Sequence, residues 1–263
     1  MPSSGERSSG SAPDRPTESQ RRTALIAGLW FVITFVASIP ALLLYGPVLN
    51  DMGYITGAGA DTPIRLGALL EVITAIANIA TAVVLFPIVK RQSEALAIGY
   101  VATRVLESTI IVVGLISLLA VVTLREDLAG AAGADAAALT TAGQSLVAIH
   151  DWTLLFGPAF CAGLGNGLLL GYLMYRSGLV PRRMALIGVI GGPLSVVGAI
   201  FVLFGAWEQT SVTQFIFTIP EIVWEASLAI YLIVKGFRPS PILDDARYTG
   251  GDGGTLRPAA AAP

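Results

Sequence analysis

The sequence predicts an all-α, polytopic membrane protein in which six transmembrane helices form one bundle between disordered termini. Apolar residues make up 54% of the 263 residues and charged residues only 13%, whereas about a quarter of an ordinary soluble domain is charged. The mean hydropathy is +0.73, so the chain lacks the polar side chains needed to cover a globule in water. The apolar residues also gather in six long runs, which is typical of helices that cross a bilayer.

The first apolar run follows a polar amino-terminal segment. Residues 1–22 are rich in Ser, Gly, Pro, Glu and Arg, and such a segment cannot bury enough surface to offset the entropy of ordering it. The run from Ala24 to Tyr45 is about 33 Å long as a helix, enough to cross a hydrocarbon core of roughly 30 Å. We therefore expect a disordered tail over 1–22, then a first transmembrane helix that is retained and not cleaved as a signal peptide.

Five further runs are long enough to span a bilayer and carry few charges. They cover residues 66–89, 96–124, 146–174, 184–206 and 212–234. Their apolar residues are continuous, which favours helices over barrel strands, where apolar and polar residues alternate. Five prolines lie inside or near the ends of spans and are expected to kink them: Pro40, Pro87, Pro158, Pro193 and Pro220. A six-helix domain over 23–238 results, followed by a second disordered tail over 239–263.

The basic residues beside the spans predict the orientation of the bundle. They gather before the first span, in the second and fourth loops, and after the sixth span: Arg21, Arg22, Lys90, Arg91, Arg176, Arg182, Arg183, Lys235 and Arg238. The intervening loops hold only Arg65 and Arg125, among several acidic residues. By the positive-inside rule, we expect both termini in the cytoplasm and the protein in the cytoplasmic (inner) membrane.

The composition excludes several classes of function. The net charge is −2 and no Lys/Arg-rich run is present, so we expect no nucleic-acid partner. Cys161 is the single cysteine and His150 the single histidine, which rules out an intrachain disulfide and any site built from two imidazoles of one chain. We expect no metal and no cofactor. The expected partners are the lipid bilayer and an unidentified small solute or cation, and the sequence leaves the oligomeric state open.

Ionisable side chains inside the spans are the candidate functional residues, because a charge at mid-bilayer costs roughly 2.5 to 3.5 kcal/mol. Three spans carry polar residues at spacings of three or four, which places each set on one helical face. The sets are Glu71, Thr74, Asn78 and Thr81; Tyr100, Arg104 and Glu107; and Gln214, Thr218, Glu221 and Glu225. We expect these three faces to meet inside the bundle, away from lipid.

Arg104 is accompanied by four carboxylates, Glu71, Glu107, Glu221 and Glu225. We expect it to pair with Glu107, Glu225 or both, because an unpaired guanidinium is not tolerated at this depth. In one interpretation this ion pair simply ties the third span to the sixth. In the other, the carboxylates left over are protonated, hydrated or bound to a cation, since one arginine cannot neutralise four of them. Glu221, one turn from Glu225, is the foremost candidate for such a carboxyl group.

His150 and Asp151 are secondary candidates near the outer end of the fourth span. Adjacent helical residues point about 100° apart, so we do not expect the Asp151 carboxylate to orient the imidazole. A serine hydrolase would need a positioned serine, and the sequence contains no GxSxG motif. A hydrogen-bonded interfacial histidine is therefore preferred to a catalytic base.

Small residues predict close contact between the fourth and fifth spans. GxxxG spacing lets two helix backbones approach each other in a membrane. The spacing occurs in both spans, at Gly167 and Gly171 and at Gly188 and Gly192. Glycines 163, 165 and 167 also resemble part of a phosphate-binding loop, but the sixth position of that motif is Leu168, so helix packing is the better interpretation.

Four segments, taken in order, resemble the domain-of-unknown-function family 4386, a set of bacterial multi-pass membrane proteins. They are Leu85-Phe86-Pro87 running to Lys90-Arg91; Gly99-Tyr100 followed by Arg104-Val105-Leu106-Glu107; Tyr175 to Arg182; and Pro220-Glu221 followed by Lys235-Gly236-Phe237. The resemblance covers about residues 21–238. One departure is Gly178, where the family pattern has a basic residue. The resemblance implies the six-helix architecture and supplies no chemistry.

The surplus of intramembrane carboxylates favours transport of a small solute or ion, coupled to protons or a cation. Two alternatives stay open, an intramembrane enzyme and a structural or regulatory membrane subunit. The enzyme would need a nucleophile beside a base, and the sequence shows no such pair or metal-ligand spacing. The subunit would leave the surplus carboxylates unexplained. The candidate transport residues are Glu71, Asn78, Arg104, Glu107, Glu221 and Glu225.

Overall fold

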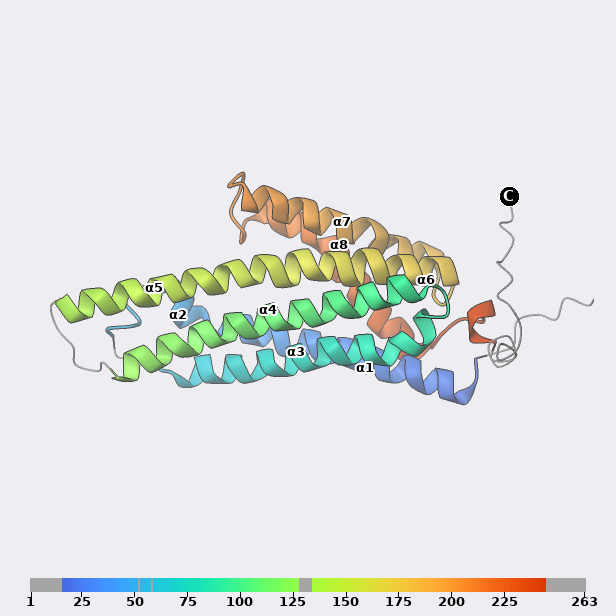
Figure 1. Ribbon diagram of the computed structural model, residues 1–263, viewed down its shortest axis with the longest axis horizontal. Helices are drawn as coiled ribbons and strands as arrows, with labels where there is room; N and C mark the ends of the chain where they lie inside the picture. Colours follow the sequence, from blue (N-terminus) through green and yellow to red (C-terminus); the bar gives the residue numbers. More distant parts are fainter. Residues whose placement is uncertain (1–15, 52, 58, 128–133, 245–263) are drawn as a thin grey trace, which may run out of the picture.

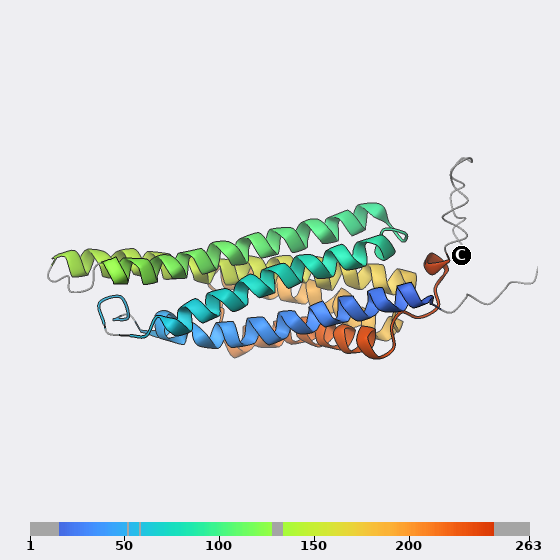
Figure 2. The ribbon, with the colours of Figure 1, turned by 90° about the horizontal axis from the view of Figure 1, so that it is seen from below.

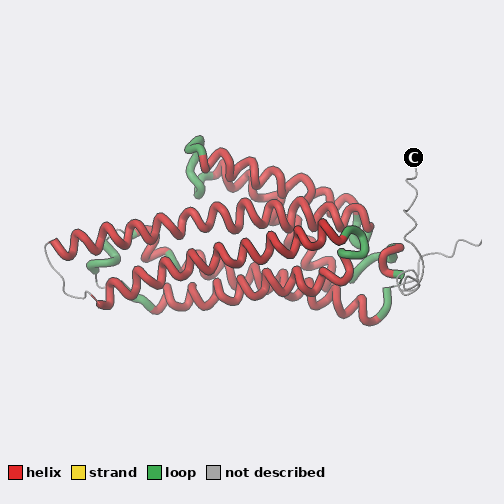
Figure 3. Tube along the Cα trace, in the orientation of Figure 1, coloured by secondary structure: helices red, strands yellow, loops and turns green. Residues whose placement is uncertain are grey.

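The computed structural model describes residues 16–51, 53–57, 59–127 and 134–244. Within these residues the regular elements are helices and no strand occurs, as Figure 3 shows. The predicted all-α class is confirmed. Residues 1–15 and 245–263 fall outside the described residues, so the expectation of disordered tails cannot be compared with the structure over these ranges.

Six helices are long and apolar enough to cross a membrane, which confirms the predicted multi-pass architecture. Five of them are single α-helices: α1 Glu18–Leu44, α3 Thr62–Val89, α4 Glu94–Asp127, α7 Arg182–Leu203 and α8 Val212–Val234. The fourth span is continuous but composite, with α5 Ala134–Leu154, η1 Leu155–Cys161, η2 Gly163–Leu170 and α6 Gly171–Ser177. A short helix, α2 Gly46–Asn50, follows the first span.

The six spans form a closed ring. Each span packs against its neighbours in the sequence, and α8 completes the ring by packing against α1. Figure 1 shows the first four spans lying side by side along the long axis, with the shorter α7–α8 hairpin on one side. Because the ring encloses an interior, polar faces of spans that are distant in the sequence can meet there.

The described parts of both tails lie at the same end of the bundle (Figure 2), called here the terminus end. A capping box between Thr17 and Gln20 starts α1 at Glu18, inside the range expected to be disordered. After α8, residues 235–244 continue with a short η3 helix, Pro241–Leu243, and Gln20 Nε2 donates to the carbonyl of Leu243 at 2.8 Å. The ordered core is therefore several residues longer at each end than expected.

The opposite end of the bundle, called here the far end, extends beyond the predicted spans. The fourth span begins at Ala134, whereas the apolar run predicted a start at residue 146. This extra segment is rich in Ala, a strong helix former, and its Leu139 is buried in a second apolar cluster with Tyr45, Tyr54, Ile64 and Leu118. Tertiary packing extends the helix where hydropathy alone predicted a loop.

The middle of the fourth span is wound as a π-helix. Segments η1 and η2 have π-helical hydrogen bonds, and η1 contains Pro158, which has no amide hydrogen to donate. The sequence predicted a kink at Pro158, and the structure winds the helix more widely around this residue. π-helical turns are rare and often occur at functional sites, and here they lie beside the interior cavity described below.

Glycines bring the fourth span against α7, as predicted. A Cβ on Gly163 would lie 2.8 Å from the carbonyl oxygen of Gly192, and one on Gly171 would lie 3.0 Å from the amide nitrogen of Val189. A Cβ on Gly188 would lie 2.7 Å from the indole of Trp224 on α8. Larger side chains at these positions would separate the helices, so the glycines fix how closely α7 packs against the fourth span and α8.

Candidate functional site

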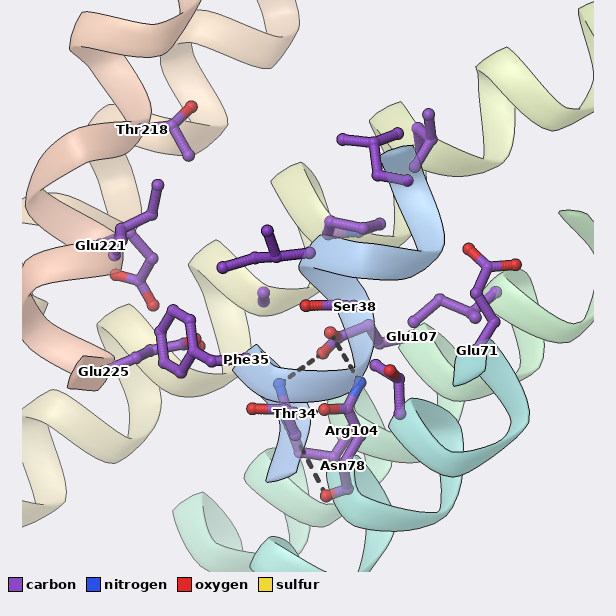
Figure 4. Close-up of a pocket in the computed structure, with 18 of the residues that line it drawn as sticks. Thr34, Phe35, Ser38, Glu71, Asn78, Arg104, Glu107, Thr218, Glu221 and Glu225 are labelled. Carbon is purple, nitrogen blue, oxygen red and sulfur yellow. Dashed lines mark hydrogen bonds and ion pairs between the residues drawn. The ribbon is translucent and has the colours of Figure 1, made fainter. Parts of the chain in front are cut away.

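The bundle encloses a cavity of about 370 Å³. Its polar lining comes from five spans: Thr34 and Ser38 on α1; Glu71, Thr74 and Asn78 on α3; Arg104 and Glu107 on α4; Thr153 on α5; Thr218, Glu221 and Glu225 on α8. All six residues of the candidate intramembrane cluster line this one cavity (Figure 4). The sequence therefore predicted correctly that the three polar faces meet.

Arg104 forms a closed set of hydrogen bonds with Glu107 and Asn78. Its guanidinium donates to Glu107 Oε2 at 2.7 Å and to Asn78 Oδ1 at 2.5 Å. Asn78 Nδ2 in turn donates to Glu107 Oε1 at 3.0 Å. All three side chains are buried. Arg104 is thus neutralised by the carboxylate one turn along its own helix.

This pairing identifies which of the two expected carboxylates binds Arg104. Glu107 is the ion-pair partner, while Glu225 receives its hydrogen bond from another residue. The interpretation in which Arg104 ties the third span to the sixth is therefore wrong. The cluster instead joins α3 to α4, where Ser108 Oγ also donates to the carbonyl of Ala75 at 3.0 Å.

Glu225 is hydrogen-bonded to Asn166 of η2 through Asn166 Nδ2. Trp224 Nε1 donates to the Asn166 backbone carbonyl at 2.9 Å, so two adjacent residues of α8 hold the same asparagine. Sequence reasoning did not place Asn166 in the site. Its signal was available, because a polar side chain inside an apolar span requires a partner.

Glu71 accepts a hydrogen bond of 2.8 Å from the Tyr45 hydroxyl. Tyr45 is fully buried at the end of α1, and its ring lies edge-on to that of His150 with 5.5 Å between centroids. Tyr45 was not among the predicted site residues, because a tyrosine at the end of a span is also typical of the membrane interface. Two of the carboxyl groups that do not pair with Arg104 thus each accept one hydrogen bond from a side chain of the protein.

Glu221 has no such donor. Its side chain is buried, and neither carboxyl oxygen has a hydrogen-bond partner among the described residues. Burial of a carboxyl group without a partner is strongly unfavourable. Figure 4 shows Glu221 and Glu225 on α8 at one side of the cavity, opposite Glu71 on α3 in this view.

Glycines let α8 approach its neighbours at this point. A Cβ on Gly191 of α7 would lie 2.8 Å from the amide nitrogen of Glu221, and one on Gly167 of η2 would overlap the Glu221 carboxyl group. The α8 backbone at Glu221 therefore lies against α7, and the Glu221 carboxyl group lies against η2 while the residue lines the cavity.

The cavity is acidic as a whole. The Arg104–Glu107 pair is internally balanced, and Glu71, Glu221 and Glu225 remain without a cationic partner in the cavity lining. Among the described residues, no group of three His, Cys, Asp or Glu side chains is placed to hold a metal ion. The arrangement can accept hydrogen bonds and positive charge from a molecule inside the cavity, and it offers no unpaired guanidinium to an anion.

The secondary candidates lie outside this cavity. His150 is buried, and its Nδ1 lies 3.7 Å from Asp151 Oδ1. This distance allows an ion pair with a charged imidazole but is too long for a hydrogen bond. The predicted hydrogen-bonded histidine is wrong at Nδ1, which has no hydrogen-bond partner among the described residues. Asp151 lines a separate hollow at the far end, with Asp51 and Gln144.

The comparisons with known proteins identify the family. No curated protein and no solved structure matches the chain. Residues 26–236 match DUF4386, a domain of unknown function. The match includes all six long helices in whole or large part and every residue of the intramembrane cluster. It confirms the resemblance found in the sequence, and the chain belongs to the DUF4386 family of multi-helix membrane proteins.

Proposed function

We propose that this protein transports a small cationic solute or ion across the membrane, and that its cavity carboxylates bind the cation and couple its movement to protons. The observation that supports this most is the state of Glu221, a buried cavity residue with no hydrogen-bond partner in the described chain. A cation or proton from outside the chain would supply the missing partner. Intramembrane carboxylates of this kind commonly mark ion and proton pathways.

The alternatives make other demands on the site. An intramembrane enzyme built on His150 would need that residue beside the cavity, and His150 is not part of the cavity lining. A structural or regulatory subunit would be expected to have a dry interior with every polar group paired. The unpartnered carboxyl oxygens of Glu221 argue against that interior.

We propose further that the terminus end faces the cytoplasm, in the cytoplasmic membrane. The basic residues around α1, the α3–α4 turn and the α6–α7 turn lie near this end, as the positive-inside rule requires. Single cysteines at Ser93 and at Thr56, in a Cys161→Ala background, test it. A membrane-impermeant thiol reagent should label Thr56→Cys and not Ser93→Cys in intact cells, and the reverse pattern would overturn this orientation.

Currents from a solid-supported membrane carrying the purified protein test the transport proposal. The bath concentration is stepped in turn for H⁺, Na⁺, K⁺, tetramethylammonium and benzyltrimethylammonium. At least one cation should give a transient transport current in wild type, and its integrated charge should fall at least tenfold in Glu221→Gln. The control is Glu208→Gln, an exposed carboxylate outside the cavity, which should leave the current unchanged. No current for any cation in wild type would overturn the proposal.

A further inference from the structure

The cavity lining also contains large apolar side chains. They are Phe35, Ile39, Leu42, Ile111, Leu154 and Ile222. These side chains come from α1, α4, α5 and α8, and they share the cavity with the carboxyl groups of α3 and α8. A site lined by both carboxyl groups and apolar side chains is complementary to a molecule with a positive charge on an apolar body.

We propose that the solute is an amphipathic organic cation, such as a quaternary or protonated amine with an apolar substituent, which reaches the cavity from the lipid between α1 and α8. This inference rests on the proposed transport function and adds the class of substrate and its route. The size of the cavity, the position of its opening and the charge of its lining each support this inference.

The size of the cavity fits an organic molecule better than an inorganic ion. Its volume of about 370 Å³ falls within the roughly 300 to 1,000 Å³ of small-molecule sites. A dehydrated Na⁺ or K⁺ would fill only a small part of this volume. An ammonium group with an apolar body would fill more of it and would contact both the carboxyl groups and the apolar side chains of the lining.

The opening lies on the side of the bundle. At the terminus end α1 and α8 are in close contact, where a Cβ on Gly28 would lie 2.8 Å from the carbonyl oxygen of Ala229. Farther along, Ile39 and Leu42 of α1 and Ile222 of α8 line the cavity and are 57%, 51% and 38% exposed, which indicates an opening between these two helices. Because this side of a membrane-spanning bundle faces lipid, an amphipathic molecule dissolved in the bilayer can reach the cavity directly.

The charge of the site selects a cation. Arg104 is already paired with Glu107 and hydrogen-bonded to Asn78, so it is not free to bind an anion. Glu221 supplies two buried oxygens without partners, and Glu225, one turn away, lines the same cavity. A quaternary ammonium interacts with carboxylates by charge and needs no directed hydrogen bonds. This suits carboxyl groups that have few hydrogen-bond donors around them.

Equilibrium binding to the purified protein in detergent tests the class of substrate, with benzyltrimethylammonium as the probe. This probe is permanently charged, so it cannot bind or cross as a neutral base. We expect saturable binding that weakens at least tenfold in Glu221→Gln and is unchanged in Glu208→Gln. Tetramethylammonium, which lacks the apolar body, should bind at least tenfold more weakly, and benzenesulfonate should not compete.

A second measurement uses wild-type protein and so does not depend on the folding of a variant. Dicyclohexylcarbodiimide, an apolar reagent that dissolves in the bilayer, should modify Glu221, as detected by mass spectrometry of the peptide. Benzyltrimethylammonium should protect Glu221 from modification, whereas an equal concentration of Na⁺ should not.

Failure of this inference can be told apart from failure of the proposed function. If Na⁺ or K⁺ gives Glu221-dependent currents and displaces the probe, the solute is an inorganic ion, so the inference is overturned and transport stands. The same conclusion follows if inorganic ions give currents and the probe does not bind. If no cation gives a current and the probe does not bind, both proposals are overturned.

Discussion

Two clusters are built around an arginine, one in the interior and one at the far end. They differ in the number of carboxyl groups near the arginine that have no ion-pair partner. At the far end, Arg125 pairs with Asp61, donates to the carbonyls of Gly57 and Gly59, and lies 4.8 Å from the centre of the Tyr54 ring. In the interior, Arg104 pairs with Glu107 and hydrogen-bonds to Asn78. Both guanidiniums are satisfied.

The difference lies in what surrounds each cluster. Around Arg125 the nearby acids, Asp61 and Glu126, each have an arginine partner, because Glu126 pairs with Arg65. Around Arg104, three carboxyl groups of the same cavity have no arginine, lysine or histidine of the lining as an ion-pair partner. A cluster that only stabilises the fold balances its charges, and the far-end cluster does so. The imbalance in the interior cluster is therefore the feature that needs a functional explanation.

The largest expected effect is from Arg104→Met. It leaves Glu107 buried without its ion-pair partner, and breaking a buried pair in this way costs about 3 to 5 kcal/mol. Thermal unfolding in detergent should show a large loss of stability. The double variant Arg104→Met/Glu107→Gln should recover part of this loss, since it removes the uncompensated charge. Equal loss in single and double variants would contradict the ion-pair account.

Arg125→Met should have a smaller effect on the same unfolding measurement. Arg125 and Asp61 are only partly buried, with side chains 13% and 19% exposed, so water can solvate the charge that remains. We expect a loss of about 2 kcal/mol from the charged hydrogen bonds, with cation currents unchanged. A loss of transport in Arg125→Met would break the distinction between a structural cluster and a functional one.

The smallest effect concerns Tyr54, which lies outside the membrane spans. Burial raises the pKa of the Tyr54 hydroxyl above its usual value, although Arg125 and Arg65 act in the opposite direction. A raised pKa in the folded state stabilises the protein below about pH 10, and this contribution is lost as the pH rises further. Tyrosinate absorbance should therefore lose one late-titrating group in Tyr54→Phe. Loss of a group that titrates as free tyrosine in Tyr54→Phe would contradict this.

The sequence predicted the six spans and their apolar character because the length of an apolar run reflects the thickness of the bilayer. It did not predict the far-end extension of the fourth span, where Leu139 is buried by packing against other helices. Nor did it predict the π-helical winding around Pro158. Both features depend on neighbours that a single run does not encode.

The candidate site shows the same limit of prediction from the sequence more clearly. Spacing of three and four residues identified the face of each helix, and all six candidate residues line one cavity. Spacing does not fix how the helices are rotated and shifted against one another, so the pairing of Arg104 with Glu107 was left open. The partners of Glu225 and Glu71 are Asn166 and Tyr45, and neither lies on one of the three predicted polar faces.

The electrostatic preference of the cavity tests most directly the claim that its surplus carboxylates form a cation site. Thr218 lines the cavity one turn before Glu221, so Thr218→Cys in a Cys161→Ala background places a thiol there. Cationic trimethylammonioethyl and anionic sulfonatoethyl methanethiosulfonates should react with it at very different rates. After correction for their rates with a free thiol, we expect the cationic reagent to react at least tenfold faster, and Glu221→Gln to reduce this preference. Equal rates for the two reagents, or a preference unaffected by Glu221→Gln, would contradict the account.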